Sequence, residues 1–198
     1  MPIRLGPLTI PWPGTGSRGD PYWESFLNRP VNDPRNVAAE MIRRAPEGAI
    51  NPIKGDIHTP EITSSHIKEL ARFVGAELVG IARVEPEQAD DGEALPFAIV
   101  CGVRAEHDPR EKPGVGGQVP TQNGLFATFV VAAYIRELGY RATAVADPNA
   151  ERLAAAAGLG RLNADGRLVA RKYGRRVHVA EVIRTDLPLA ADGQAVPV

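Results

Sequence analysis

Residues 157–189, AGLGRLNADGRLVARKYGRRVHVAEVIRTDLPL, contain the pattern that decides the fold of this chain. Gly158 is expected to end a helix, because glycine readily adopts the left-handed conformation found at helix ends. Residues 166–170 and 176–185 are rich in branched apolar side chains and predict two strands. Tyr173 and Gly174 predict a turn between them. The segment therefore predicts a helix end followed by strands that close a sheet.

The residues just before this segment alternate between strand and helix signals. Residues 141–145 predict a strand, and Asp147 with Pro148 predicts the start of a helix that runs to residue 157. Residues 122–138 predict the longest helix, which is expected to be central to the packing. Its expected apolar face consists of Leu125, Phe126, Phe129, Val130, Ala133, Tyr134 and Leu138.

Further toward the N-terminus, a helix is expected from Thr63 to Gly75, with an apolar stripe made of Ile67, Leu70, Ala71 and Val74. Residues 77–84 and 97–104 are short apolar runs of strand length. An acidic loop with Asp90, Asp91 and Glu93 separates them. Both runs are expected to belong to a central sheet.

The first part of the chain differs in composition from the rest. Ten of the 18 prolines and both tryptophans fall within the first 60 residues. We therefore expect residues 1–62 to form a proline-rich arm with short helices, residues 63–189 the main domain, and residues 190–198 a loose tail. In the arm, Asp33 and Pro34 predict a short helix with Val37, Met41 and Ala45 on one face, after an apolar cluster of Trp23, Phe26 and Leu27.

The overall charge argues against nucleic acid and membranes as partners. The chain of 198 residues has 23 Lys and Arg against 24 Asp and Glu, so it presents no broad positive field. No run approaches the roughly 20 apolar residues of a membrane span, and the N-terminus lacks the pattern of a signal peptide. A cytoplasmic location is expected.

The inventory of metal-binding side chains is small. Cys101 is the only cysteine, whereas an iron–sulfur cluster needs about four thiolates, so no cluster can draw its ligands from this chain alone. Cys101 lies in an apolar run and is expected to be buried. His58, His66, His107 and His178 have no metal-ligand spacing, and no metal site is predicted. The glycines at 114, 116 and 117 complete no phosphate-binding motif.

Three segments together resemble one known family. Residues 157–189, YIRELGY at 134–140 and HIKELARFVGAELVGIA at 66–82 are similar to the corrinoid-binding part of reductive dehalogenases and epoxyqueuosine reductases. The family pattern runs AGLG-x-LG-x-x-G-LL, then YGPRVRL, then TDLPL. The resemblance covers about residues 63–189. It implies a nitroreductase-like α+β fold, with a mixed, mostly antiparallel sheet packed with helices, that holds a corrinoid base-off at the sheet edge without a histidine ligand.

The resemblance also implies where cobalamin would bind. The implied cofactor-binding residues are Gly158, Leu159, Gly160, Gly166, Arg167, Leu168, Val169, Arg176 and Val177. Family members continue into a cysteine-rich ferredoxin-like segment, which this sequence lacks. The tyrosine that donates a proton in the dehalogenases would align near Thr121, so no catalytic residue is assigned.

Four positions depart from the family pattern in the same segment. Asn163 replaces a glycine, Arg175 replaces a proline, and Arg167 and Arg171 interrupt an apolar stretch. The arginines have two readings: they pair with a phosphate or with propionamide oxygens of the cofactor, or they line a solvated face of a closed pocket.

Three functions follow from this reading. The first is a corrinoid-binding protein or subunit that takes electrons from a separate ferredoxin-type or flavin partner; if it is an enzyme, it is a cobalamin-dependent oxidoreductase. The second is a degenerate dehalogenase-like domain that acts as a scaffold or partner subunit without cofactor, in a homo- or heterodimer that Trp12 and Trp23 would suit. The third is a flavin-binding oxidoreductase of nitroreductase type.

Overall fold

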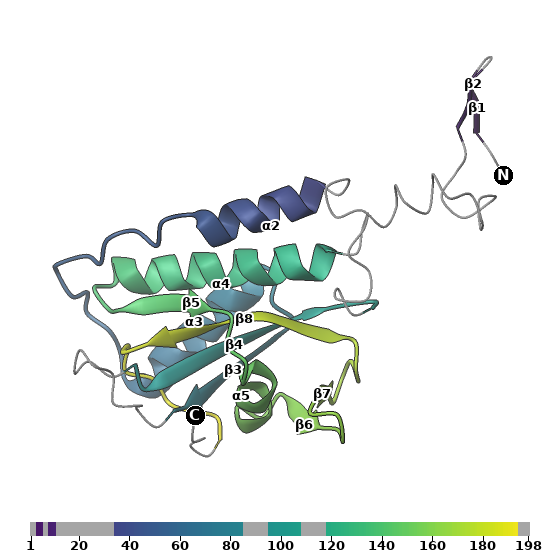
Figure 1. Ribbon diagram of the computed structural model, residues 1–198. Helices are drawn as coiled ribbons and strands as arrows, with labels where there is room; N and C mark the ends of the chain where they lie inside the picture. The colour runs from purple at the N-terminus through teal and green to yellow at the C-terminus, as the bar shows by residue number, and fades with distance from the viewer. Residues whose placement is uncertain (1–2, 6–7, 11–33, 85–94, 108–117, 194–198) are drawn as a thin grey trace.

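A computed structural model describes residues 3–5, 8–10, 34–84, 95–107 and 118–193 (Figure 1). A two-stranded antiparallel pair, β1 (Ile3–Leu5) and β2 (Leu8–Ile10), lies in the segment expected to be an arm with short helices. The remaining elements are α2 (Pro34–Arg44), α3 (Pro60–Phe73), β3 (Leu78–Arg83), β4 (Phe97–Arg104), α4 (Val119–Glu137), β5 (Ala142–Val145), α5 (Ala150–Ala156), β6 (Gly160–Leu162), β7 (Leu168–Ala170) and β8 (Val177–Thr185). The apolar cluster at Trp23 and the acidic loop at Asp90 lie outside the described residues.

A four-stranded antiparallel sheet forms the centre of the fold, with the strand order β3-β4-β8-β5. Strands β3 and β4 are close to continuous apolar runs because helices or a ribbon cover both faces of the sheet, whereas β8 also carries His178, Glu181 and Arg184. The predicted α+β fold with a mostly antiparallel sheet is confirmed. One expectation was wrong: residues 168–170 do not join this sheet, because β7 pairs with β6 as a separate ribbon.

The sheet lies between two layers, as Figure 1 shows. Helices α3 and α4 cover one face, and α2 packs against the outside of α4. Helix α5 and the β6–β7 ribbon cover the other face. Each face has its own apolar cluster, one around Ile99, Ile135 and Ile183, and the other around Val100, Leu153 and Val182. Neighbouring residues of one strand therefore contribute to opposite cores.

The buried face of α4 differs from the predicted one. Phe126 is 48% exposed and Tyr134 44%, although both were assigned to the apolar face. Leu125 is fully buried, as predicted. The residues that α4 buries beside it are mostly small or medium, among them Gly124, Ala127, Thr128, Val131 and Ala132. The reason is close packing: a Cβ added at Gly124 would lie 2.7 Å from Cβ of Ala180 on β8. Large side chains on this face would hold the helix away from the sheet.

The contact face of α2 and the start of α5 also differ from expectation. On α2, Met41 is 69% exposed, and the residue that α2 buries is Ala39. The residue at the N-cap of α5 is Asn149, not Asp147. Asp147 forms the turn just before the helix, where its carboxylate accepts a hydrogen bond of 2.7 Å from the backbone N–H of Asn149.

A loop from the N-terminal part of the chain closes the C-terminal end of α4. The backbone N–H groups of Asn51 and Gly55 donate to the carbonyls of Arg136 and Leu138, at 3.0 Å each. Gly139 has a φ of +82°, and a Cβ there would lie 2.8 Å from the carbonyl oxygen of Ile53. Only glycine allows this close approach.

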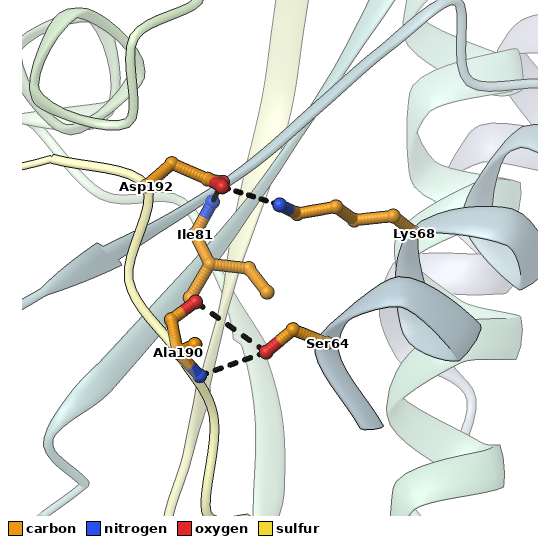
Figure 2. A network of polar contacts seen from close by, with 5 residues as sticks. All are labelled: Ser64, Lys68, Ile81, Ala190 and Asp192. Carbon is orange, nitrogen blue, oxygen red and sulfur yellow. Dashed lines mark hydrogen bonds and ion pairs between the residues drawn. The ribbon is translucent and has the colours of Figure 1, made fainter. Parts of the chain in front are cut away.

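The segment after Leu189 is anchored as far as residue 193, although we expected residues 190–198 to be loose. Figure 2 shows that Asp192 accepts a hydrogen bond of 2.8 Å from the backbone N–H of Ile81 and forms an ion pair with Lys68. Its own backbone N–H donates to the carbonyl of Ile81 at 2.8 Å. The backbone N–H of Ala190 donates to the Ser64 hydroxyl at 2.8 Å. The segment thus covers the outer edge of β3 and ties it to α3.

Candidate functional site

An open depression lies where α5, the β6–β7 ribbon and the following turn meet. Its volume is about 590 Å³, within the range of about 300–1,000 Å³ that is usual for ligand pockets. Seven residues line it: Gly158, Gly160, Arg161, Val169, Ala170, Arg171 and Gly174. The depression therefore lies within the AGLG-to-YGRRV segment from which the cofactor site was predicted.

Local sequence features build the walls of this depression. Helix α5 ends at Gly158, which has a φ of +74°, and the backbone N–H of Leu159 donates back to the carbonyl of Ala154 at 3.0 Å. Asn163 closes the β6–β7 turn, because its side-chain oxygen accepts hydrogen bonds from the backbone N–H groups of Asp165 and Arg167, at 3.1 and 2.8 Å. The asparagine that replaces the family glycine therefore has a structural role here.

A second turn completes the site. Gly174 has a φ of +59° and forms a two-way backbone pair with Ala170, with hydrogen bonds of 2.8 and 2.9 Å. A Cβ added at Gly158 or Gly174 would have no atom within 4 Å. Both glycines therefore expose their backbone to open space.

The structure divides the nine predicted cofactor-binding residues into two groups. Gly158, Gly160 and Val169 line the depression. The other six lie elsewhere. Leu159, Leu168 and Val177 pack into the apolar cluster beside α5, and Gly166 lies in the exposed β6–β7 turn. Arg167 pairs with Glu151 at 3.6 Å, and the exposed Arg176 donates its backbone N–H to the carbonyl of Tyr173.

Four lining residues were not predicted: Arg161, Ala170, Arg171 and Gly174. Strand β6 has only three residues, GRL, so the sequence gave no periodic signal for it. Pairing of Arg161 with Val169 brings Arg161 to the same face as the predicted Val169. The signal that pointed to Arg171 was its departure from the family pattern.

Comparison with known proteins links this fold to one family. A structure of the catabolic reductive dehalogenase NpRdhA superposes on 83% of this chain with a TM-score of 0.66 and 26% sequence identity. A structure of a reductive dehalogenase for which a mechanism of B12-dependent dehalogenation was suggested covers all of this chain, with a TM-score of 0.64 and 25% identity. This chain is similar to the reductive dehalogenases.

The similarity has clear bounds. The dehalogenase-like chain spans about a quarter of the length of these solved structures, 25% and 28%. An epoxyqueuosine reductase bound to a tRNA stem loop matches at a TM-score of 0.45 and 10% identity, too low to support an argument. No family model and no curated protein matches the chain.

Thr121, which we expected to align with the proton-donating tyrosine of the dehalogenases, lies in the first turn of α4 and is buried. Cys101 is fully buried in β4, and burial raises the pKa of its thiol to about 12, so it is not a nucleophile at neutral pH. The rings of His58 and His66 meet edge to face at 5.6 Å, a contact that their spacing did not predict.

None of the helices that the structure describes has the length and apolar character needed to cross a membrane. In the described part of the chain, no three or more side chains of His, Cys, Asp and Glu gather as a metal ion would require.

A second, smaller cavity of about 70 Å³ lies between α2, α4 and the sheet. Glu181 reaches into it from β8, where its carboxylate accepts a hydrogen bond of 3.3 Å from the Thr128 hydroxyl. Burial raises the pKa of Glu181 above its usual range, and the Thr128 hydrogen bond and the Arg43 charge offset only part of this effect.

This burial predicts a pH-dependent effect of Glu181→Gln. A carboxyl whose pKa is higher in the folded chain stabilises the fold when protonated, and this contribution is lost as the pH rises through the raised pKa. The variant should therefore gain stability relative to the unmodified chain from about pH 4.3, the usual pKa of glutamate, upward. Urea denaturation of both proteins at pH 4, 5.5 and 7 measures the difference. A difference that does not change with pH would contradict the assignment.

Proposed function

We propose that the dehalogenase-like chain binds a corrinoid in the depression beside α5. The observation that supports this proposal most directly is the open lining of the depression. Gly158 and Gly174 expose their backbone, and Val169 offers an apolar surface between them. A flat macrocycle can approach the backbone closely at the two glycines, because neither carries a side chain that would keep the ligand away.

The residues present fit binding better than they fit a complete redox cycle. Gly158, Gly160 and Val169 would contact the macrocycle, and Arg161 and Arg171 would contact its polar periphery. A bound cobalamin would supply cobalt redox chemistry, whereas the sequence offers a single cysteine and no tyrosine at the position of Thr121. We therefore propose that electrons come from a separate redox partner.

The experiment is an absorbance titration of the purified protein with cobalamin, followed through the change from the base-on to the base-off spectrum. A saturable change is expected. Val169→Glu should weaken binding at least tenfold, because it places a charge on the apolar surface. Val37→Glu on α2, away from the depression, should leave binding unchanged. No spectral change with a folded protein would refute corrinoid binding.

A second candidate function is that of a partner subunit without cofactor. Its support is the apolar surface of the outer helices: Met41 on α2 and Phe126 on α4 are exposed although the two helices pack together. Exposed apolar patches mark interaction surfaces. Sedimentation velocity should then detect a dimer that Met41→Lys or Phe126→Lys dissociates. A monomer at all concentrations would count against a second copy as the partner.

A further inference from the structure

We propose that the depression recognises an oxyanion, and that the guanidinium groups of Arg161 and Arg171 hold it. This inference rests on the proposed corrinoid function, because we identify the oxyanion as the phosphodiester in the nucleotide tail of cobalamin. Neither arginine was among the predicted cofactor-binding residues. Arg171 departs from the dehalogenase pattern, and Arg161 lies on a strand that the sequence did not predict.

Arg161 and Arg171 both line the depression, and both side chains are exposed. Arg161 lies on β6 and pairs with Val169 in the antiparallel register, so these two side chains share one face of the ribbon. Arg171 directly follows β7, in the turn that leads to Gly174. Because both long side chains line one depression, they can reach one ligand group.

The charges around the depression are strongly unbalanced. Residues 158–177 contain six Lys and Arg against one acidic residue, Asp165, in a chain whose net charge is −1. Asp165 accepts a hydrogen bond from the side-chain amide of Asn163, and the carboxylate of Glu151 on α5 pairs with Arg167. Among the described residues, no carboxylate forms an ion pair with Arg161 or Arg171, and both side chains are exposed. Two unpaired guanidinium groups at the edge of a concave site favour an anionic ligand group.

The shape of the site favours a small oxyanion over a polyanion. The cations line a depression of about 590 Å³ with glycine backbone at its rim, whereas nucleic acid needs an extended positive surface. Arginine also binds phosphate through two parallel N–H donors, which lysine cannot do. The site thus combines an apolar surface at Val169 for a macrocycle with two forked donors, Arg161 and Arg171, for a phosphate.

The test compares cobalamin, which carries the phosphodiester, with cobinamide, which lacks the nucleotide tail. We expect the unmodified chain to bind cobalamin at least tenfold more tightly than cobinamide. In the double variant Arg161→Gln, Arg171→Gln this preference should disappear, while affinity for cobinamide is retained. Arg72 is an exposed arginine on α3 at the other face of the sheet, and Arg72→Gln, which removes one positive charge away from the depression, should keep the preference. Each of the single variants, Arg161→Gln and Arg171→Gln, should keep more of the preference than the double variant.

The outcomes separate the two proposals. Equal affinity for both corrinoids, or a preference that survives in the double variant, would overturn the oxyanion inference and leave corrinoid binding in place. If neither corrinoid binds, the proposed function fails, and a titration with inorganic pyrophosphate decides the inference. Chemical-shift changes at the Nε–H groups of Arg161 and Arg171 would then support a site for free phosphate, and unchanged shifts would overturn it.

Discussion

Gly80→Val is expected to lower the free energy of unfolding by about 3 kcal/mol, because it overpacks the contact between the sheet and the AGLG segment. Gly80 lies on β3, and a Cβ there would be 2.7 Å from Cβ of Ala157 and 2.9 Å from the carbonyl oxygen of Ala157. The same Cβ would lie 2.9 Å from Cδ2 of Leu159. A backbone oxygen cannot move aside alone, so α5 and the following turn must shift together. Chemical denaturation followed by circular dichroism measures the loss.

A second glycine provides the control for this prediction. A Cβ at Gly55 would lie 3.5 Å from Cδ2 of Leu138, an ordinary van der Waals contact, so Gly55→Ala should change stability by less than about 0.5 kcal/mol. Because the AGLG turn forms the rim of the depression, Gly80→Val should also weaken cobalamin binding. Equal stability of the Gly80 and Gly55 variants would mean that residues 157–159 do not pack on β3.

The strands of the central sheet could be predicted closely from the sequence. The expected strand at 97–104 coincides with β4, and the expected strands at 77–84 and 176–185 contain β3 and β8. Strands β3 and β4 are buried along most of their length, so each appears in the sequence as an apolar run, whereas β8 carries His178, Glu181 and Arg184 among its branched apolar residues. The ends of such a strand can be predicted from the sequence, because charged or turn-forming residues flank the apolar run.

The helices were predicted in place but not in orientation. For α4 the largest apolar side chains were expected to face the core, yet the sheet contacts Gly124 and Thr128. These contacts depend on a register shift between β4 and β8 near residue 101. Beside this shift, the consecutive residues Ala180 and Glu181 both face α4. Such a bulge is a property of strand pairing and leaves no mark in the helix sequence.

The candidate site was predicted in part, since Gly158, Gly160 and Val169 line the depression as expected, whereas Gly174 was missed. Gly158 and Gly160 follow from the AGLG motif, whereas Arg161 enters the site through its pairing with Val169 across the ribbon. Leu159 and Leu168 belong to the same motif but pack into the core beside α5. Residues that adjoin in a strand face opposite sides, so a contiguous motif cannot specify which members contact a ligand.

Asp192→Ala is expected to lower the free energy of unfolding by about 2 kcal/mol, although its position near the end of the sequence suggested a loose tail. The carboxylate accepts the backbone N–H of Ile81 at 2.8 Å and is paired with Lys68 (Figure 2). Because Lys68 and Asp192 remain partly exposed, the ion pair contributes less than the charged hydrogen bond to β3. Lys68→Met should therefore cost only about 0.5 kcal/mol.

Comparing Asp192→Ala with a control variant shows whether residues 190–193 hold the outer edge of β3. Asp56→Ala removes an exposed carboxylate for which the structure shows no partner among the described residues, and it should leave stability unchanged. Hydrogen exchange adds a local measure, since the Ile81 amide should be protected in the unmodified chain and exchange faster in Asp192→Ala. If Asp192→Ala and Asp56→Ala behave alike in both measurements, the outer edge of β3 is not held by residues 190–193. Faster exchange of the Ile81 amide together with a loss of stability in Asp192→Ala would show that this short segment completes the sheet.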